Sequence, residues 1–316
     1  MLAILAITSP IYLAILIGYV LTRQGVFDKP ALRALGAFVI KLALPALVFK
    51  ALAERRIGDI LNVSYLVAYT VASLGMVAAG YLAARRFARY SRSSSAVVAM
   101  GMSCSNSGFV GYPILLLTFA PVAGVALALN MIVENALMLP LLLALAERGA
   151  GHAGPWYRLA GTLLRRLATN PIVMAVMAGL AVSLLGVTLP APLARTVDLF
   201  AMASSAVSLL VIGGTLVGLH IGPLARRAAL IVVAKLVGHP LAVWAALGGV
   251  SLLGLPALDP ALAMAAVLLA AMPMLSIYPI LAQAYGEEAL AATVLLLGTV
   301  ASFVTLSALL WWWRSA

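Results

Sequence analysis

Few side chains in this sequence could carry chemistry, and most of these lie inside long apolar segments. Lys41, Glu134 and His239 are ionisable residues whose neighbours are almost all hydrophobic. A charged side chain at the centre of a bilayer costs about 2.5–3.5 kcal/mol on insertion scales, so such residues usually face a partner or a water-filled cavity. The single cysteine, Cys104, excludes an internal disulfide and a cysteine-based metal site. We therefore expect no cofactor.

Lys41 and Glu134 each have two interpretations. Lys41 could attract a carboxylate substrate, or it could pair with an acidic residue, for which Glu134 is the candidate. Glu134 could carry a coupling proton, or it could only neutralise Lys41. Asn130 and Asn135 lie beside Glu134, and Asn130 shares its helix face because the two are four residues apart. Glu134, Asn130 and Asn135, together with His239, are the predicted residues of ion coupling or support, and Lys41 is predicted among the substrate-binding residues.

His239 and Lys235 lie in one later apolar segment. His239 directly precedes Pro240, so a neutral imidazole bonded to a carbonyl that the proline frees is the simpler interpretation. A role in proton relay is the alternative. Lys235 lies closer to the cytoplasmic end of the segment, and we expect its long side chain to reach the interface there.

The segment around residues 95–118 carries the first group of predicted substrate-binding residues. Small polar residues and glycines favour leaving the helix, and a proline suits the first turn of a new half-helix. Within a membrane, freed backbone groups are tolerated only where protein or a water-filled cavity satisfies them. The positive N-terminal end of the new half-helix would then favour an anion. The candidate residues are Ser105, Asn106, Ser107, Gly111, Tyr112 and Pro113.

A second break is predicted in the segment 261–284, where Pro273, Ser276, Tyr278 and Pro279 are the candidates. Tyr-Pro-Ile-Leu begins at Tyr112 and again at Tyr278, so a shift of 166 residues superposes the two segments. Two membrane segments broken at corresponding points of two halves are the sequence pointer to a transporter's binding site. A pair of simple packing kinks is the alternative.

The elements that position these residues are membrane helices. Hydrophobic residues make up 65% of the 316 positions and charged residues 9%, against about 25% charged in globular proteins. We predict an all-α polytopic membrane protein. Its ten transmembrane helices are expected near 3–22, 31–53, 62–84, 95–118, 121–146, 171–187, 196–218, 228–252, 261–284 and 288–313.

A polar interval divides these helices into two halves of five. The halves are residues 1–147 and 171–316, and residues 148–170 form a basic cytoplasmic loop. Because five crossings are an odd number, the halves insert with opposite orientation, as inverted repeats with broken crossover helices 4 and 9. The net charge of +11 lies mostly between apolar runs, so it is a topology signal and does not indicate nucleic acid.

The distribution of basic residues predicts the orientation. The positive-inside rule places the richer group in the cytoplasm and both termini outside. That group is Arg23, Lys29, Arg33, Arg85, Arg86, Arg89, Arg92, Arg148, Arg158, Arg165, Arg166, Arg226 and Arg227. The poorer group is Arg55, Arg56, Arg195 and Arg314. The Trp311–Trp313 cluster then anchors the last helix at the outer interface.

Several motifs together resemble the auxin efflux carrier family. The pattern Asn-x-x-x-x-Gly-x-Pro that begins at Asn106 is similar to that family's first crossover, and Pro45 on the second helix also fits. The stretch from Met272 to Leu281 resembles the second crossover of the bacterial, malonate-transporter-like branch. The resemblance implies ten helices, two crossed broken helices and an elevator-like movement. Met272 and Pro273 stand where a counterpart of Asn106 would be expected.

These observations predict a secondary active transporter of small organic anions, with malonate or a similar carboxylate as substrate. A passive anion channel is an alternative from another class, and an intramembrane lipid-modifying enzyme is a further one. The enzyme would need a nucleophile with its base, and no such set is evident. The coupling ion, H⁺ or Na⁺, stays open. We expect a multi-pass protein of the bacterial inner membrane, and the resemblance suggests a homodimer.

Overall fold

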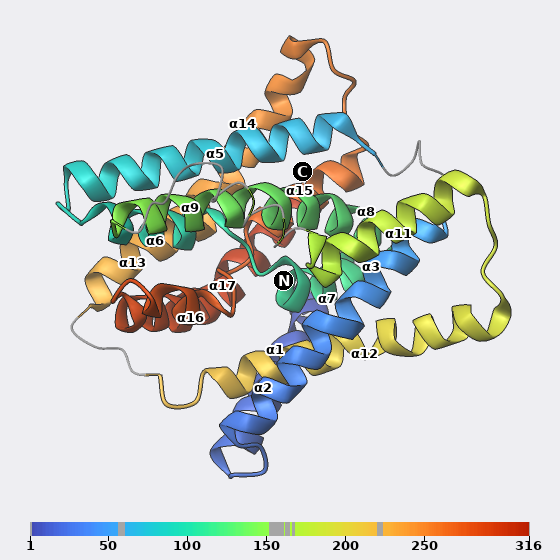
Figure 1. Cartoon of the computed structure of the whole chain (residues 1–316), viewed down its shortest axis with the longest axis horizontal. Helices are drawn as coiled ribbons and strands as arrows, with labels where there is room; N and C mark the ends of the chain where they lie inside the picture. Colours follow the sequence, from blue (N-terminus) through green and yellow to red (C-terminus); the bar gives the residue numbers. More distant parts are fainter. Residues whose placement is uncertain are drawn as a thin grey trace. The chain divides into compact units, whose positions relative to one another are not determined.

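The computed structural model describes residues 2–55, 61–151, 161, 165, 168–219 and 224–315, and within this part every regular element is a helix (Figure 1). The chain folds into two compact units. Unit 1 comprises Met1–Asn62, Ser107–Ile132 and Ala168–Gly218, and unit 2 comprises Val63–Asn106, Val133–Leu167 and Leu219–Ala316. Each unit therefore combines residues from both halves of the sequence.

Unit 1 packs its helices closely through glycines. Gly18 on α1 (Leu2–Arg23) and Gly213 on α12 (Ala191–Thr215) face the backbone of the opposite helix, so a methyl group at either position would overlap that backbone. In the same way, Gly179 lies against Phe49 and Leu52. The other elements of unit 1 are α2 (Lys29–Phe38), η1 (Val39–Ala43), α3 (Leu44–Ala53), η2 (Ser107–Gly111), α7 (Tyr112–Thr118), α8 (Ala120–Met131) and α11 (Pro171–Leu185).

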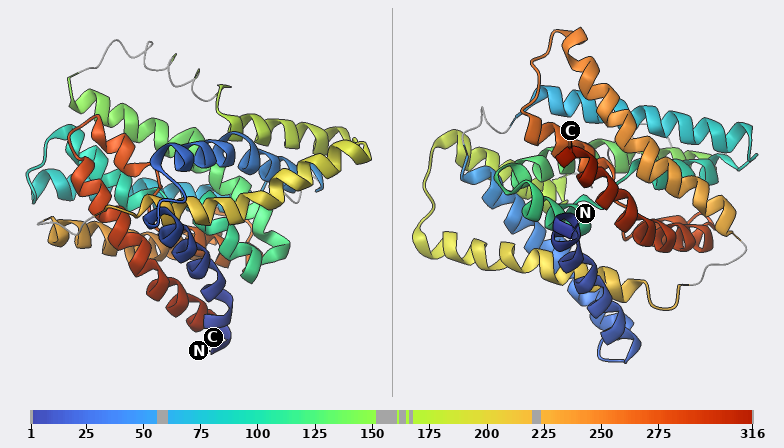
Figure 2. Two further views of the ribbon diagram at one scale, coloured as in Figure 1. Left: turned by 90° about the horizontal axis from the view of Figure 1, so that it is seen from below. Right: turned by 180° about the vertical axis from the view of Figure 1, so that it is seen from behind.

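Unit 2 contains the ionisable residues Glu134, Lys235 and His239. Here α5 (Val63–Arg86) packs on α6 (Arg92–Ser103) and on α14 (His239–Gly249), while α17 (Glu288–Ser315) packs on α13 (Ala225–Val233) (Figure 2). The remaining elements of unit 2 are η3 (Ile132–Met138, whose first residue belongs to unit 1), α9 (Leu139–Gly149), η4 (Ala234–Gly238), η5 (Val250–Leu253), α15 (Pro260–Ala270) and α16 (Tyr278–Gln283).

Four wide π turns occur in these helices, and each ends two residues before a proline. The turns η1, η2, η3 and η4 precede Pro45, Pro113, Pro140 and Pro240. Proline removes one backbone donor, and its ring collides with the carbonyl four residues earlier. Widening the preceding turn moves that carbonyl away, so the helix can continue past the proline.

Six helices in the described part are long and apolar enough to cross a membrane by length and composition. They are Lys29–Ala53, Val63–Arg86, Ala120–Gly149, Ala191–Thr215, Ala225–Leu253 and Glu288–Trp313. Three apolar helices are shorter: Ser9–Arg23, Pro171–Leu185 and Pro260–Ala270.

Some of the predicted topology signals lie outside the described residues. These are Arg56, Arg158 and Arg166, together with most of the basic loop predicted at 148–170. The histidines at 152 and 220 also lie outside the described part.

Candidate functional site

The first predicted break is present, and it is short. α6 ends at Ser103, Cys104 is extended, and the helix resumes as the π turn η2 at Ser107. The sequence predicted that Pro113 would stand in the first turn of a new half-helix. The π turn before Pro113 accommodates the ring, and Pro113 lies in the first turn of α7. Only Cys104, Ser105 and Asn106 are outside regular structure.

The second break is longer, and the two prolines explain its limits. α15 ends at Ala270 and α16 begins at Tyr278. Pro273 disfavours helical geometry at the residue before it, which agrees with the end of the helix ahead of Met272. Pro279 then stands in the first turn of α16, where its missing N–H costs nothing.

The two breaks meet within unit 2. The Asn106 N–H donates to the Pro273 carbonyl at 2.8 Å, and the Asn106 side-chain amide donates to Ser276 Oγ, also at 2.8 Å. Asn106 is 3% exposed, and Ser276 is half-buried. The unequal halves predicted from the sequence therefore join through one asparagine, which contacts both a backbone carbonyl and a serine of the other break.

Tyr278, one of the predicted substrate-binding residues, is held by a hydrogen bond to α6. Its side chain is fully buried, and its hydroxyl donates to the Val97 carbonyl on α6 at 3.0 Å. Gly101 lies one turn further along α6 and leaves room for the ring, because a methyl group there would stand 2.6 Å from the hydroxyl oxygen. Tyr278 thus fixes the start of α16 onto α6, and its hydroxyl is not directed at the breaks.

Lys235 lies at the centre of unit 2, and our expectation for it was wrong. The side chain is 0% exposed and does not extend to an interface. Its Nζ lies 2.7 Å from Ser105 Oγ, 2.6 Å from the Ala270 carbonyl oxygen and 3.1 Å from His239 Nδ1. The ammonium therefore contacts the first break, the last residue of α15 and the neighbouring turn of its own helix.

His239 also differs from its simpler interpretation. Its ring bonds two side chains, Ser73 Oγ through Nε2 at 2.9 Å and Lys235 through Nδ1, and the partner is not a carbonyl freed by Pro240. The π turn η4 absorbs the effect of that proline instead. The Tyr69 ring packs edge-on against the imidazole. A neutral imidazole fits these contacts if Nδ1 accepts from the ammonium and Nε2–H donates to the serine.

Glu134 is the acidic counterpart of this cluster. It is 1% exposed, and its Oε1 accepts the Ser105 N–H at 2.9 Å. Ser105 consequently lies between the two charges, since its hydroxyl accepts from Lys235 while its amide donates to Glu134. Asn135, next to Glu134, is half-buried.

The other predicted residues belong to unit 1. Asn130 is fully buried and donates its side-chain amide to Ser107 Oγ at 2.6 Å. Gly111 and Pro113 are buried, and Tyr112 is half-buried. Lys41 is exposed within its unit, on the π turn η1. Because Lys41 and Glu134 fall in different units, both interpretations of Lys41 stay predictions.

Three partners in unit 2 were not among the predicted site residues: Tyr69, Ser73 and Lys235. Hydroxyls scattered in an apolar helix give no periodic signal, so Tyr69 and Ser73 were not recognisable. Lys235 was recognisable, because it lies four residues before His239 and such pairs share a helix face.

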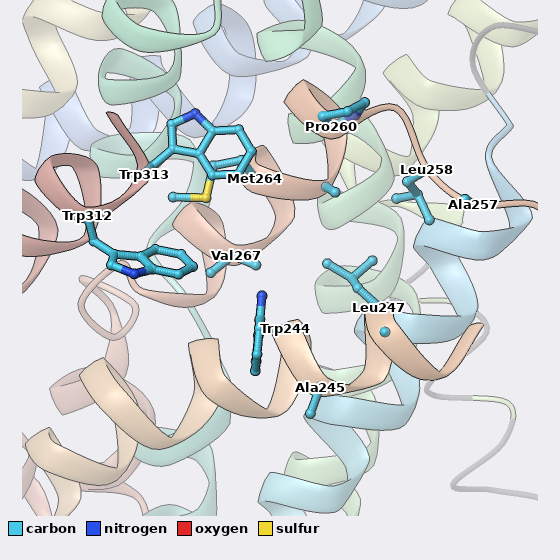
Figure 3. A pocket seen from close by; sticks show the side chains of 12 residues that line it. Trp244, Ala245, Leu247, Ala257, Leu258, Pro260, Met264, Val267, Trp312 and Trp313 are labelled. Atoms are coloured by element: carbon cyan, nitrogen blue, oxygen red, sulfur yellow. The ribbon is translucent and has the colours of Figure 1, made fainter. Parts of the chain in front are cut away.

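A separate apolar pocket of about 480 Å³ lies elsewhere in unit 2. Figure 3 shows Trp244, Met264, Val267, Trp312 and Trp313 around it. The side chains that line it carry no charge, so it offers no counter-charge for a carboxylate. In the described part of the chain, no cluster of three or more His, Cys, Asp or Glu residues is placed to bind a metal ion.

Known proteins match this chain along its whole length. The family model described as "Membrane transport protein" matches residues 4–154 and 155–311. The chain is 30% identical over 315 residues to the "Putative malonate transporter" of Rhizobium meliloti (strain 1021), which covers 99% of this chain and 96% of that protein. It is 27% identical over 210 residues to the "Uncharacterized transporter YfdV" of Escherichia coli (strain K12), over 66% of this chain and 67% of that protein.

Proposed function

Because the chain belongs to the membrane transport protein family, which is the auxin efflux carrier family, we propose that it is a secondary active transporter of small organic anions. The relative named as a malonate transporter makes malonate, or a similar short carboxylate, the first substrate to test. Secondary transporters bind their substrates where two broken helices meet.

The observation that carries this proposal is the junction of the two breaks in unit 2. Asn106 bonds the backbone at Pro273 and the hydroxyl of Ser276, so groups from two distant parts of the sequence converge at one place. The Ser276 side chain is half-buried, so part of it stays accessible. A carboxylate accepts hydrogen bonds from amides and hydroxyls, and both donors are present here.

The charge of the surroundings supports an anionic substrate. Lys235 lies directly behind the first break, and its contact with Ser105 links it to the residue next to Asn106. Glu134 lies on the other side of Ser105, where it accepts the Ser105 N–H, and supplies the counter-charge. We propose that the substrate contacts Asn106, Ser276 and freed backbone groups, with Lys41 as a further candidate from unit 1.

The proposed mechanism is alternating access of an elevator-like kind. Both breaks contact each other through Asn106, so the junction can move as one piece during transport. The proposal includes ten membrane helices in two inverted halves and a place in the cell membrane with both termini outside. Glu134 and His239 are the proposed proton carriers if protons drive transport.

Uptake of labelled malonate by proteoliposomes tests the proposal, with other carboxylates as competitors. We expect saturable uptake that unlabelled malonate suppresses. An absence of saturable uptake for malonate and every competing carboxylate would overturn the proposed function. Uptake that never exceeds equilibrium under an imposed gradient would favour the passive channel instead.

A further inference from the structure

The buried ammonium of Lys235 touches both broken helices of unit 2 at once. It donates to Ser105 Oγ in the first break and to the Ala270 carbonyl at the end of α15, where the second break begins. Ser105 and Ala270 are far apart in the sequence, and one cation joins them. This places the charge directly at the junction of the breaks.

The Ala270 carbonyl lies at the C-terminal end of α15, where a cation is favoured. The last carbonyls of a helix lack intrahelical donors and carry the negative end of the helix dipole. In transporters with broken helices, such ends and unwound carbonyls are where a coupling cation is coordinated. In this protein a covalently attached cation occupies that position, and its nitrogen lies 2.6 Å from the carbonyl oxygen.

The contacts of Lys235 match those of a charged ammonium group. An ammonium has three N–H donors and no acceptor, and three acceptors surround this one: Ser105 Oγ, the Ala270 carbonyl oxygen and His239 Nδ1. The counter-charge is also built in, because Glu134 binds the amide of Ser105. Among the side chains that the structure describes, three buried ones belong to Asp, Glu, Lys, Arg or His residues. They are Lys235, Glu134 and His239.

We propose that Lys235 is a tethered cation that takes the place of a coupling sodium ion at the junction of the broken helices. Transport by this protein is then independent of sodium. Lys235 acts as a positioning residue, because it holds the two breaks together through Ser105 and Ala270 and is not placed against the substrate. The inference rests on the proposed transport function, but its central claim concerns ion binding and can be tested separately.

The first experiment measures malonate uptake by proteoliposomes in sodium chloride and in choline chloride of equal ionic strength. The wild type is expected to transport equally well in both salts. Lys235→Ala is expected to lose at least about tenfold in choline, because a buried carbonyl and a hydroxyl lose their donor. Sodium or methylammonium is expected to restore part of that uptake by filling the vacated position. Lys29→Ala, which removes an exposed lysine in unit 1, is the matched control and should behave like the wild type.

The second experiment measures thermal unfolding of the purified, detergent-solubilised chain in the same salts. A ligand that binds only the folded state raises the melting temperature. Sodium should leave the melting temperature of the wild type unchanged and raise that of Lys235→Ala. This arm needs no transported substrate, so failure of the proposed function and failure of the tethered cation give different results.

Three results would overturn the inference. One is sodium-stimulated uptake or sodium-dependent stability in the wild type, which counts whether or not the variant folds. Another is Lys235→Ala with full uptake in choline. The third is a folded Lys235→Ala whose uptake and stability respond to neither cation. Lys235→Arg keeps the charge, and it should retain sodium independence.

Discussion

Gly101 offers the sharpest test of how the second broken helix is positioned. A methyl group at this position would stand 2.6 Å from Tyr278 Oη, 2.9 Å from Tyr278 Cζ and 3.1 Å from Ile231 Cγ2. Tyr278 is fully buried and bonded to the Val97 carbonyl, so its ring has no free space to enter. Gly101→Ala must therefore displace the first residue of α16.

The expected size of this effect follows from its components. Overpacking a tight interior costs about 1–3 kcal/mol. Losing the hydrogen bond between Tyr278 and Val97 costs about 0.5–1.5 kcal/mol. Alanine regains about 0.5–1 kcal/mol over glycine within a helix. We therefore expect Gly101→Ala to lower the free energy of unfolding by about 2 kcal/mol.

Gly75→Ala is the matched control, since Gly75 lies within α5 of the same unit and nothing stands within 4 Å of a methyl group there. It should raise the free energy of unfolding by about 0.5–1 kcal/mol. Both variants can be compared by denaturant titration in mixed micelles. In a Tyr278→Phe background, Gly101→Ala should cost about 1 kcal/mol less, because the closest clashing atom is gone. Two results would contradict a collision between the new methyl group and the Tyr278 hydroxyl. One is equal stability of the two alanine variants, and the other is that the unfolding free-energy changes of Gly101→Ala and Tyr278→Phe simply add.

Two further predictions concern the junction of the breaks and the packing of unit 1. Asn106→Ala removes the donor to Ser276 Oγ and keeps the backbone bond to Pro273, so malonate uptake should fall about tenfold while the protein stays folded; unchanged uptake would remove Asn106 from the site. Gly213→Ala would push a methyl group into the backbone of α1, so no folded protein should be recovered from membranes by size-exclusion chromatography. Gly36→Ala meets only ordinary contact in the same unit and serves as the control, and a well-folded Gly213→Ala protein would contradict the close packing.

The sequence was sufficient to locate both breaks, because their causes are local. Pro273 disfavours helical geometry at the residue before it, and the small polar residues around Asn106 form a weak helix. Family membership, inferred from these same motifs, is confirmed. The length of the first break was not predictable in the same way. A π turn at Ser107–Gly111 absorbs the effect of Pro113, and no local pattern distinguishes such a turn from an unwound stretch.

The direction of the Lys235 side chain could not be predicted from the sequence. Its position along the helix follows from the sequence, but the direction of its side chain depends on which neighbours surround the helix. Acceptors in the first break and at the end of α15 make the interior favourable for this lysine, and both are distant in the sequence. The same reason explains the partners of His239, because Ser73 belongs to another helix. The position of a charged residue within an apolar segment was therefore predictable, whereas the direction of its side chain and its partners were not.

The most direct measurement of the central claim is accumulation of labelled malonate by proteoliposomes that contain only this protein. We predict that an imposed proton gradient drives malonate above its external concentration, with equal accumulation in sodium and in choline. Asn106→Ala should abolish most of that accumulation. Entry that stops at the external concentration under every imposed gradient would contradict the account, and so would accumulation that requires sodium.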